Sequence, residues 1–191
     1  MQFAPKRHHT AATHGFTLIE MMVVLSIVGI LTALALPSLR TFIGNWQVAN
    51  AVNAFSASLQ LARSEAVKRG RFVRMCRSDN GTTCGAGNNL PSGWASGWIV
   101  YVDNDASGGV TVADEVVRSQ SALNNFDNIT SSSATLRAFA FSPTGLMQYG
   151  AGSQGMNFSW DSGGTIRKAL CISFTGRTRV VKDNTDCTGE Y

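Results

Sequence analysis

GFTLIEMMVVLSIVGILTALALP, residues 15–37, is an almost uninterrupted apolar stretch whose one charged residue is Glu20. At a rise of 1.5 Å per residue, residues 16–36 are long enough to cross a hydrocarbon core of roughly 30 Å. The sequence therefore predicts a transmembrane helix over 16–36. Residues 1–15 are polar and basic, and Lys6 and Arg7 favour retention of that end in the cytoplasm.

The position of Gly15 indicates that this helix stays on the mature protein. A secretory signal peptide ends its apolar run with a small-residue cleavage site and is then discarded. Here the polar segment ends in Gly15, directly before the apolar run. Cleavage after Gly15 would remove residues 1–15 as a leader and make Phe16 the first residue.

Glu20 needs a partner if it enters the membrane. A carboxylate near the bilayer interior costs about 2.5–3.5 kcal/mol on insertion scales, and such groups are usually paired. The new α-amino group of Phe16 lies one helical turn away on the same helix, and a neighbouring subunit offers the same group. The alternative is that Glu20 lies at headgroup depth and extends its carboxylate to water.

The segment Gly15–Glu20 and the apolar run after it resemble the prepilin signature of type IV pilins and type II secretion pseudopilins. The resemblance implies cleavage after Gly15 by the prepilin peptidase and N-methylation of Phe16. It also implies that Glu20 pairs with the Phe16 ammonium group of an adjacent subunit, so other major and minor pilins are expected partners. The expected location is the cell inner membrane, with a single span and a periplasmic head that enters a pilus or pseudopilus fibre.

The chain after the span is expected to continue as an amphipathic helix over 37–70. Pro37 stands at the membrane edge, where it is expected to kink the helix or end it locally. Lys68, Arg69 and Gly70 place cations and a glycine at the C-terminal end of the helix, as is common there. We expect a helix over 16–69 whose second half packs on a head domain through one apolar stripe. The stripe consists of Val48, Val52, Phe55, Leu59, Ala62 and Ala66.

Residues 71–191 change to a hydrophobic period of two, which is typical of strands. Turns rich in Gly, Asn and Ser separate the alternating segments. We expect an α+β fold in which a β-sandwich or two small antiparallel sheets stack on the second half of the helix. The expected strands are Phe72–Arg77, Gly97–Val102, Glu115–Ser119, Leu136–Ser142, Met156–Trp160, Ala169–Phe174 and Thr178–Lys182.

Several segments of the head resemble the FimT/FimU and GspH-type minor pilins. They are LARSEAVKRG at 61–70, the expected strand Gly97–Asp105, the FSPTG turn Phe141–Gly145, and the late segment Leu170–Val180. This resemblance implies a low-abundance subunit at or near the fibre tip rather than the major pilin.

The four cysteines form two local pairs, Cys76 with Cys84 and Cys171 with Cys187. Neither pair has the CxxC spacing of a zinc or redox site. Behind an export signal we expect two disulfides, each closing a loop of about 10–15 residues and stabilising the head by roughly 2–4 kcal/mol. Buried free thiols are the alternative.

The mature chain is expected to contain no histidine, because His8, His9 and His14 all precede residue 16. Without imidazole, a His general base, a Ser–His nucleophile pair and a His metal ligand are excluded. The Cys, Ser and carboxylate positions show no catalytic spacing. The sequence therefore indicates a protein that is not an enzyme, with no catalytic residue, cofactor or small-molecule substrate.

Cations concentrate in two segments of the chain. Six lie between Arg63 and Arg77 with one acid, Glu65, and the net charge of the whole chain is +4. Such clusters create local fields that the net charge hides. The second group consists of Arg167, Lys168, Arg177, Arg179 and Lys182.

Gly176-Arg177-Thr178-Arg179 lies between two expected strands, where it should form an exposed turn. Arginines at i and i+2 of an extended chain point the same way and could bridge successive phosphates. In the FimT-like minor pilins, a C-terminal GRxR motif is associated with DNA binding in natural transformation, and Gly176, Arg177 and Arg179 match it. The resemblance implies double-stranded DNA as a partner of this turn, aided by Arg167, Lys168 and Lys182. The alternative is a solvated hairpin that keeps the protein soluble.

Asp103-Asn104-Asp105-Ala106-Ser107-Gly108, with Val110 and Asp114, loosely matches a calcium-binding loop. Its flanks, however, are expected strands, and its last acid is Asp rather than a bidentate Glu. From the sequence alone, a polar hairpin turn without a metal is the better interpretation.

Two functions remain open at this stage. The first is a minor type IV pilin that captures DNA for uptake. The second is a purely structural subunit, either a tip or priming minor pilin or a type II secretion pseudopilin, that binds no nucleic acid. Salt-dependent DNA binding separates the two, because contacts to phosphates release counterions.

Overall fold

The computed structural model describes residues 15–85, 93–124, 126, 128–133, 136–148, 154–161, 163, 165–182 and 187. The chain divides into two compact units, Met1–Arg40 and Thr41–Tyr191, which are described separately. The long helix α1 (Leu18–Arg69) contributes to both units. The other elements belong to the second unit. They are β1 (Phe72–Arg77), η1 (Trp94–Ser96), β2 (Trp98–Asp103), β3 (Glu115–Gln120), β4 (Asn128–Ser131), β5 (Ala138–Phe141), β6 (Gln154–Ser159), β7 (Arg167–Ile172) and β8 (Thr178–Val181).

In the first unit, α1 begins at Leu18 because Thr17 caps it. The Thr17 Oγ1 atom accepts a hydrogen bond from the backbone N–H of Glu20 at 3.3 Å, which satisfies one of the free donors at a helix start. The helix then continues through Pro37, as the expected helix over 16–69 requires, so of the two alternatives for Pro37 the local end is not realised. An 18-residue window of α1 has a mean hydropathy of 2.4 and no buried residue, so its length and composition would allow it to cross a membrane.

In the second unit, the amphipathic stripe of α1 forms the centre of the core, and all six of its expected residues are buried. Phe55 is the focus of this packing. Its ring meets those of Trp94, Trp98, Phe139 and Phe158 edge to face, with centroid distances of 5.2–5.8 Å. Rings from both sheets therefore converge on one helix residue.

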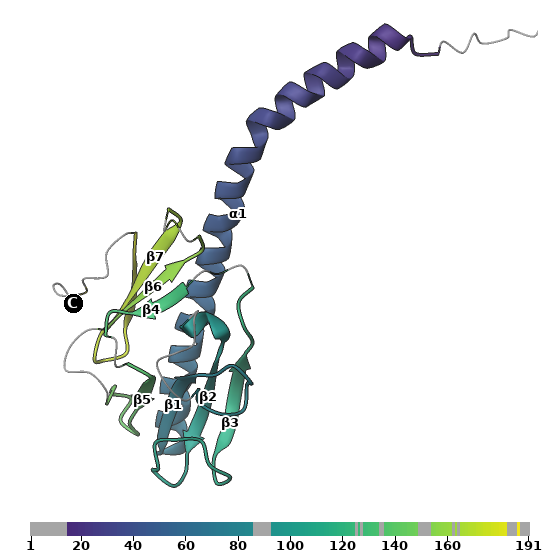
Figure 1. Cartoon of the computed structure of the whole chain (residues 1–191). Coiled ribbons are helices and arrows are strands. Elements are labelled where there is room, and N and C mark those ends of the chain that lie inside the picture. The colour runs from purple at the N-terminus through teal and green to yellow at the C-terminus, as the bar shows by residue number, and fades with distance from the viewer. Residues whose placement is uncertain are drawn as a thin grey trace, which may run out of the picture. The chain divides into compact units, whose positions relative to one another are not determined.

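The strands form two antiparallel four-stranded sheets, as the expected α+β fold requires (Figure 1). The first has the order β3-β2-β1-β5 and the second the order β4-β6-β7-β8. All seven expected strands are present. Phe72–Arg77 has the expected bounds as β1, and the other six differ at one or both ends. β4 was not among the expected strands; it is short, and its buried Ile129 stands beside polar neighbours.

The expected cysteine pairs are both disulfides in the structure. Cys76 joins Cys84 and Cys171 joins Cys187, with Cα–Cα distances of 5.6 and 5.5 Å. The first bridge holds its loop against the outer side of the first sheet. There Cys76, Ile99 and Tyr101 form a second, smaller hydrophobic cluster.

Candidate nucleic-acid interface

The turn between β7 and β8 is fixed by hydrogen bonds within residues 173–177. The backbone N–H of Gly176 donates to the Ser173 carbonyl at 2.8 Å, and that of Ser173 donates to the Arg177 carbonyl at 2.9 Å. The Ser173 hydroxyl accepts a hydrogen bond from the Arg177 N–H at 3.1 Å and bonds the Thr175 hydroxyl at 2.7 Å. The backbone that carries Arg177 is therefore held in one conformation.

A second turn of the same construction supports the first. In residues 142–146, Gly145 N–H donates to the Ser142 carbonyl at 2.8 Å, and the hydroxyls of Ser142 and Thr144 lie 2.8 Å apart. The two turns are joined directly, because the N–H of Met147 donates to the carbonyl of Phe174 at 2.9 Å. The FSPTG segment therefore stabilises the turn with the arginines.

The register of the second sheet decides which cations share a face. Arg179 pairs with Cys171, and side chains alternate along a strand, so Arg179 lies on the face opposite the core residues Leu170 and Ile172. Arg167 is four residues before Cys171 in β7, and Arg177 is two residues before Arg179, so the residues of each pair are an even number of positions apart. Both also belong to this outer face. Its three arginines, Arg167, Arg177 and Arg179, are exposed.

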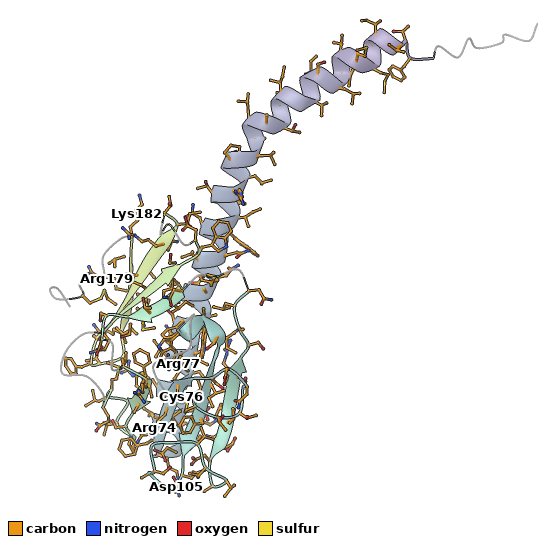
Figure 2. All side chains as sticks on the ribbon, in the orientation of Figure 1. Arg74, Cys76, Arg77, Asp105, Arg179 and Lys182 are labelled. Carbon is orange, nitrogen blue, oxygen red and sulfur yellow. A yellow bond between two sulfur atoms is a disulfide. The ribbon has the colours of Figure 1, made fainter. Side chains whose placement is uncertain are left out.

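The two lysines fall on the other face of the sheet. Lys168 is two residues before the core residue Leu170. Lys182 is two residues after Val180, which pairs with Leu170. Figure 2 shows Arg179 and Lys182 on this C-terminal sheet, while Arg74 and Arg77 lie on the first sheet. The structure thus places Arg177 and Arg179 side by side at the turn. Arg167 shares their face of the sheet but lies at the other end of β7, four residues before Cys171, and Lys168 and Lys182 lie on the opposite face.

The disulfide Cys171–Cys187 lies on the same outer face as the arginines. Cys171 is the residue opposite Arg179 in the β7–β8 ladder. The bridge fixes Cys187, five residues beyond Lys182, beside Cys171 of β7. It therefore limits how far β8 can separate from β7.

Helix α1 adds cations that the motif did not reveal. A groove of about 500 Å³ runs beside the turn and is lined by Gln60, Arg63, Ser64, Val67, Lys68 and Gly176. A Cβ atom built on Gly176 would lie 3.3 Å from the Arg63 Cδ atom. In the sequence, only the group of cations between residues 63 and 77 indicated that helix α1 could bring positive charge to the turn at Gly176.

Much of that first cation cluster is engaged in ion pairs. Arg69 Nε lies 2.6 Å from Glu65, and its Nη1 lies 2.6 Å from Glu115, which raises the pKa of Arg69 and lowers that of Glu115. Arg74 pairs with Asp103 at 2.5 Å. Burial, aided by the charge of Arg137, lowers the pKa of Arg77. The six cations between Arg63 and Arg77 are therefore less available to bind phosphates than their number suggests.

The processing and assembly residues lie in the first unit. Gly15 and Phe16 precede the helix, and Phe16 and Glu20 are exposed in the isolated chain. Pro37 is inside α1.

Two sequence profiles match the chain. The profile of the type II transport protein GspH covers residues 51–176, and the prokaryotic N-terminal methylation motif covers residues 11–36. The chain belongs to the GspH family of minor pilins and pseudopilins. A probable minor fimbrial protein of Dichelobacter nodosus is 31% identical over 125 residues, which are 65% of this chain and 69% of that protein.

Other relatives of this GspH-family chain match over shorter segments or with low identity. A fimbrial protein of Pseudomonas aeruginosa is 42% identical over 62 residues, and the chain spans 40% of its length. Among solved structures, the type IV minor pilin FimU of P. aeruginosa has a TM-score of 0.49 at 17% identity, covering 72% of this chain and 89% of FimU. The minor pseudopilin EpsH of Vibrio cholerae has a TM-score of 0.48 at 9% identity, covering 71% and 97%.

Proposed function

We propose that this GspH-family protein is a minor type IV pilin whose head binds extracellular double-stranded DNA for uptake in natural transformation. The observation that carries the proposal is the turn at Gly176, which presents the exposed side chains of Arg177 and Arg179 on one face of the sheet. The GRxR resemblance points to the same residues.

The geometry of this face suits a phosphate backbone. Side chains at i and i+2 of an extended chain are about 6.8 Å apart and parallel, so two guanidinium groups reach two phosphates of one strand. Hydrogen bonds within the turn fix its backbone in advance, which reduces the ordering entropy that binding costs. Contacts to phosphates alone give binding without sequence preference.

The N-terminal segment supplies the anchor in this proposal. The prepilin peptidase removes residues 1–15 after Gly15, and residues 16–36 hold the subunit in the inner membrane as a single span. Residues 37–70 carry the helix to the head at 71–191. Assembly with other pilins uses Glu20, which pairs with the Phe16 ammonium group of a neighbour, and Pro37 at the membrane edge.

The test is double-stranded DNA binding by the full-length protein in detergent micelles, measured by fluorescence anisotropy over a salt series. R177A/R179A should weaken binding by roughly 10-fold or more and reduce the slope of log K against log salt by about 2, one for each lost phosphate contact. The matched control is K168A/K182A, which removes the same charge from the other face and should lose much less. Equal losses in both variants would contradict an interface centred on the arginines.

The second candidate is a structural pseudopilin or tip subunit. The match to the type II transport protein GspH over residues 51–176 favours it, since the profile covers most of the head. If the folded, oxidised protein binds no DNA at low salt, this function replaces the first, and the arginine turn is a solvated hairpin.

A further inference from the structure

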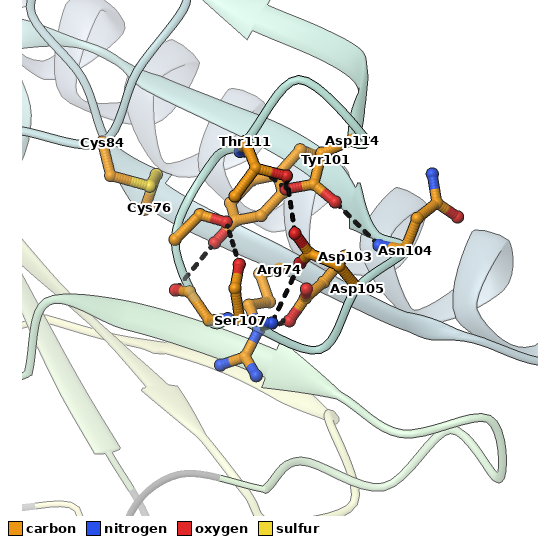
Figure 3. A network of polar contacts seen from close by, with 12 residues as sticks. Arg74, Cys76, Cys84, Tyr101, Asp103, Asn104, Asp105, Ser107, Thr111 and Asp114 are labelled. Atoms are coloured by element: carbon orange, nitrogen blue, oxygen red, sulfur yellow. Dashed lines mark hydrogen bonds and ion pairs between the residues drawn. A yellow bond between two sulfur atoms is a disulfide. The ribbon is translucent and has the colours of Figure 1, made fainter.

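The hairpin loop between β2 and β3 brings three carboxylates together. Asp103 ends β2 and Asp114 directly precedes β3, so the loop runs over the twelve residues 103–114. Asp103, Asp105 and Asp114 each contribute one carboxylate oxygen to this cluster, and the three oxygens lie within 4.8 Å of one another (Figure 3). Two oxygens that each lie about 2.4 Å from one ion are at most about 4.8 Å apart, so these separations are within the reach of one Ca²⁺ ion, whose Ca²⁺–O distances are about 2.3–2.6 Å.

Asp103 supplies a second, independent observation. Its side chain is fully buried, and its Oδ2 atom accepts hydrogen bonds from Arg74 Nε at 2.5 Å and from the N–H of Gly108 at 3.2 Å. Its Oδ1 atom is buried and has no hydrogen-bond partner among the described residues. Buried carboxylate oxygens are normally satisfied, because leaving one without a partner is costly. A cation in the loop would satisfy this oxygen.

The remaining carboxylates are held in place by the loop itself. Asp105 accepts hydrogen bonds from Ser107 N–H at 3.0 Å and from the Thr111 hydroxyl at 2.8 Å. Asp114 accepts from Asn104 N–H at 2.7 Å and from Thr111 N–H at 2.8 Å. A carboxylate oxygen that accepts one hydrogen bond still has a lone pair for a metal. The site is therefore ordered without needing the ion to fold it.

Charge also favours a divalent ion. Of the three carboxylates, Asp103 pairs with the Arg74 guanidinium, while Arg71 reaches the loop at the Asn104 carbonyl, at 3.1 Å; Asp105 and Asp114 form no ion pair among the described residues. Two charges of one sign in a partly buried loop repel one another, and a divalent cation neutralises them.

The spacing of oxygen donors selects the metal. Counted from Asp103, acids or hydroxyls occupy positions 1, 3, 5, 9 and 12, and a glycine with φ 81° occupies position 6. At position 7, the Gly109 carbonyl accepts a hydrogen bond from the Ser107 hydroxyl at 3.2 Å. Carboxylate, hydroxyl and carbonyl oxygens at these positions are the ligands of calcium loops. We propose that the loop Asp103–Asp114 binds one calcium ion through Asp103, Asp105 and Asp114, although two strands rather than two helices flank it.

The affinity should be low. Position 12 holds Asp114, where a bidentate Glu would supply two oxygens, so the site has fewer ligands than a sensor loop. Extracellular calcium modules with such incomplete sites have dissociation constants of about 10⁻⁴–10⁻³ M. This range matches the head's expected exposure to the cell exterior.

The test uses full-length protein in detergent micelles, titrated with CaCl₂ by calorimetry and with Tb³⁺ by luminescence. Tyr101 should sensitise Tb³⁺, because its hydroxyl donates to the Gly108 carbonyl at 3.1 Å in the loop. The exposed variant D105N should bind Ca²⁺ at least roughly 10-fold more weakly, and so should D114N, whereas D79N, an exposed acid outside the loop, should bind as the wild type does.

Two results would overturn the calcium site. One is the absence of saturable Ca²⁺ binding by the wild type up to about 10 mM, above the affinity range of such modules. The other is undiminished binding by D105N. Asp105 is exposed, so this variant is expected to stay folded, and its melting temperature without calcium checks that.

Discussion

Gly176 holds a backbone conformation that other residues reach only with strain. Its φ is 77°, and a Cβ atom would lie 2.9 Å from the Phe141 ring. G176A should therefore destabilise the head by about 1–3 kcal/mol, measured as a lower melting temperature of the full-length protein in calcium-free buffer. The matched control is G109A, because no atom lies within 4 Å of its added Cβ and its φ is not left-handed. If both variants melt alike, the turn at Gly176 tolerates a side chain.

At the residue scale, the sequence indicated which cations could bind DNA better than it indicated which of them share a face of the sheet. The motif pointed to Arg177 and Arg179 because its spacing is local. The motif does not include Lys168 and Lys182. The alternation of side chains along each strand puts them on the other face from Arg167 and Arg179, and the pairing of Arg179 with Cys171 shows which face is the outer one. The buried oxygen of Asp103 was equally hidden, because burial depends on what folds over a residue.

At the scale of elements, Phe55 should be the most sensitive point of the helix–sheet packing. It is fully buried and contacts four aromatic rings from η1 and both sheets. F55A should cost about 3–5 kcal/mol of unfolding free energy, because it leaves a cavity that the rings cannot close. Denaturant unfolding of the full-length protein checks this, with V67A as a control at a side chain that is 55% exposed. A loss below about 1 kcal/mol would contradict this role.

The elements also show where local pattern is enough and where it is not. The end of α1 was predictable, because Gly70 follows two cations and has a φ of 63°. The strand Asn128–Ser131 was missed, because three of its four residues are polar and its β-structure comes from pairing with β6. Pro37 lies inside α1, which continues as the expected helix over 16–69 does, since membrane helices often tolerate proline.

At the scale of the whole molecule, one chain carries an apolar helical segment, a face with arginines and an acidic loop. The apolar segment before Arg40 belongs to the first unit, and the second unit carries both the arginine face of the C-terminal sheet and the acidic loop of the first sheet. The two charged surfaces have opposite sign and lie on different sheets. Calcium at the loop would therefore reduce repulsion between the head and an anionic partner without competing for the arginines.

In the proposed function, Glu20 pairs with the Phe16 ammonium group of a neighbouring subunit during assembly, and substitution of Glu20 tests that role. E20A removes the one charge in residues 16–36, so membrane insertion should be preserved or favoured. Incorporation into fibres should nevertheless fall by about 10-fold or more, because the partner ammonium group loses its counter-charge in a low-dielectric environment. The measurement is the share of the protein in sheared fibres against the share left in membranes of the host cell.

The control for this prediction is S26A, a polar residue in the same span. The Ser26 hydroxyl donates to the Met22 carbonyl at 2.7 Å within its own helix, so it needs no partner from a neighbouring subunit. S26A should therefore enter fibres like the wild type. If E20A also does so, Glu20 makes no contact that assembly needs. Its carboxylate would then lie at headgroup depth, where water rather than a neighbouring chain satisfies it.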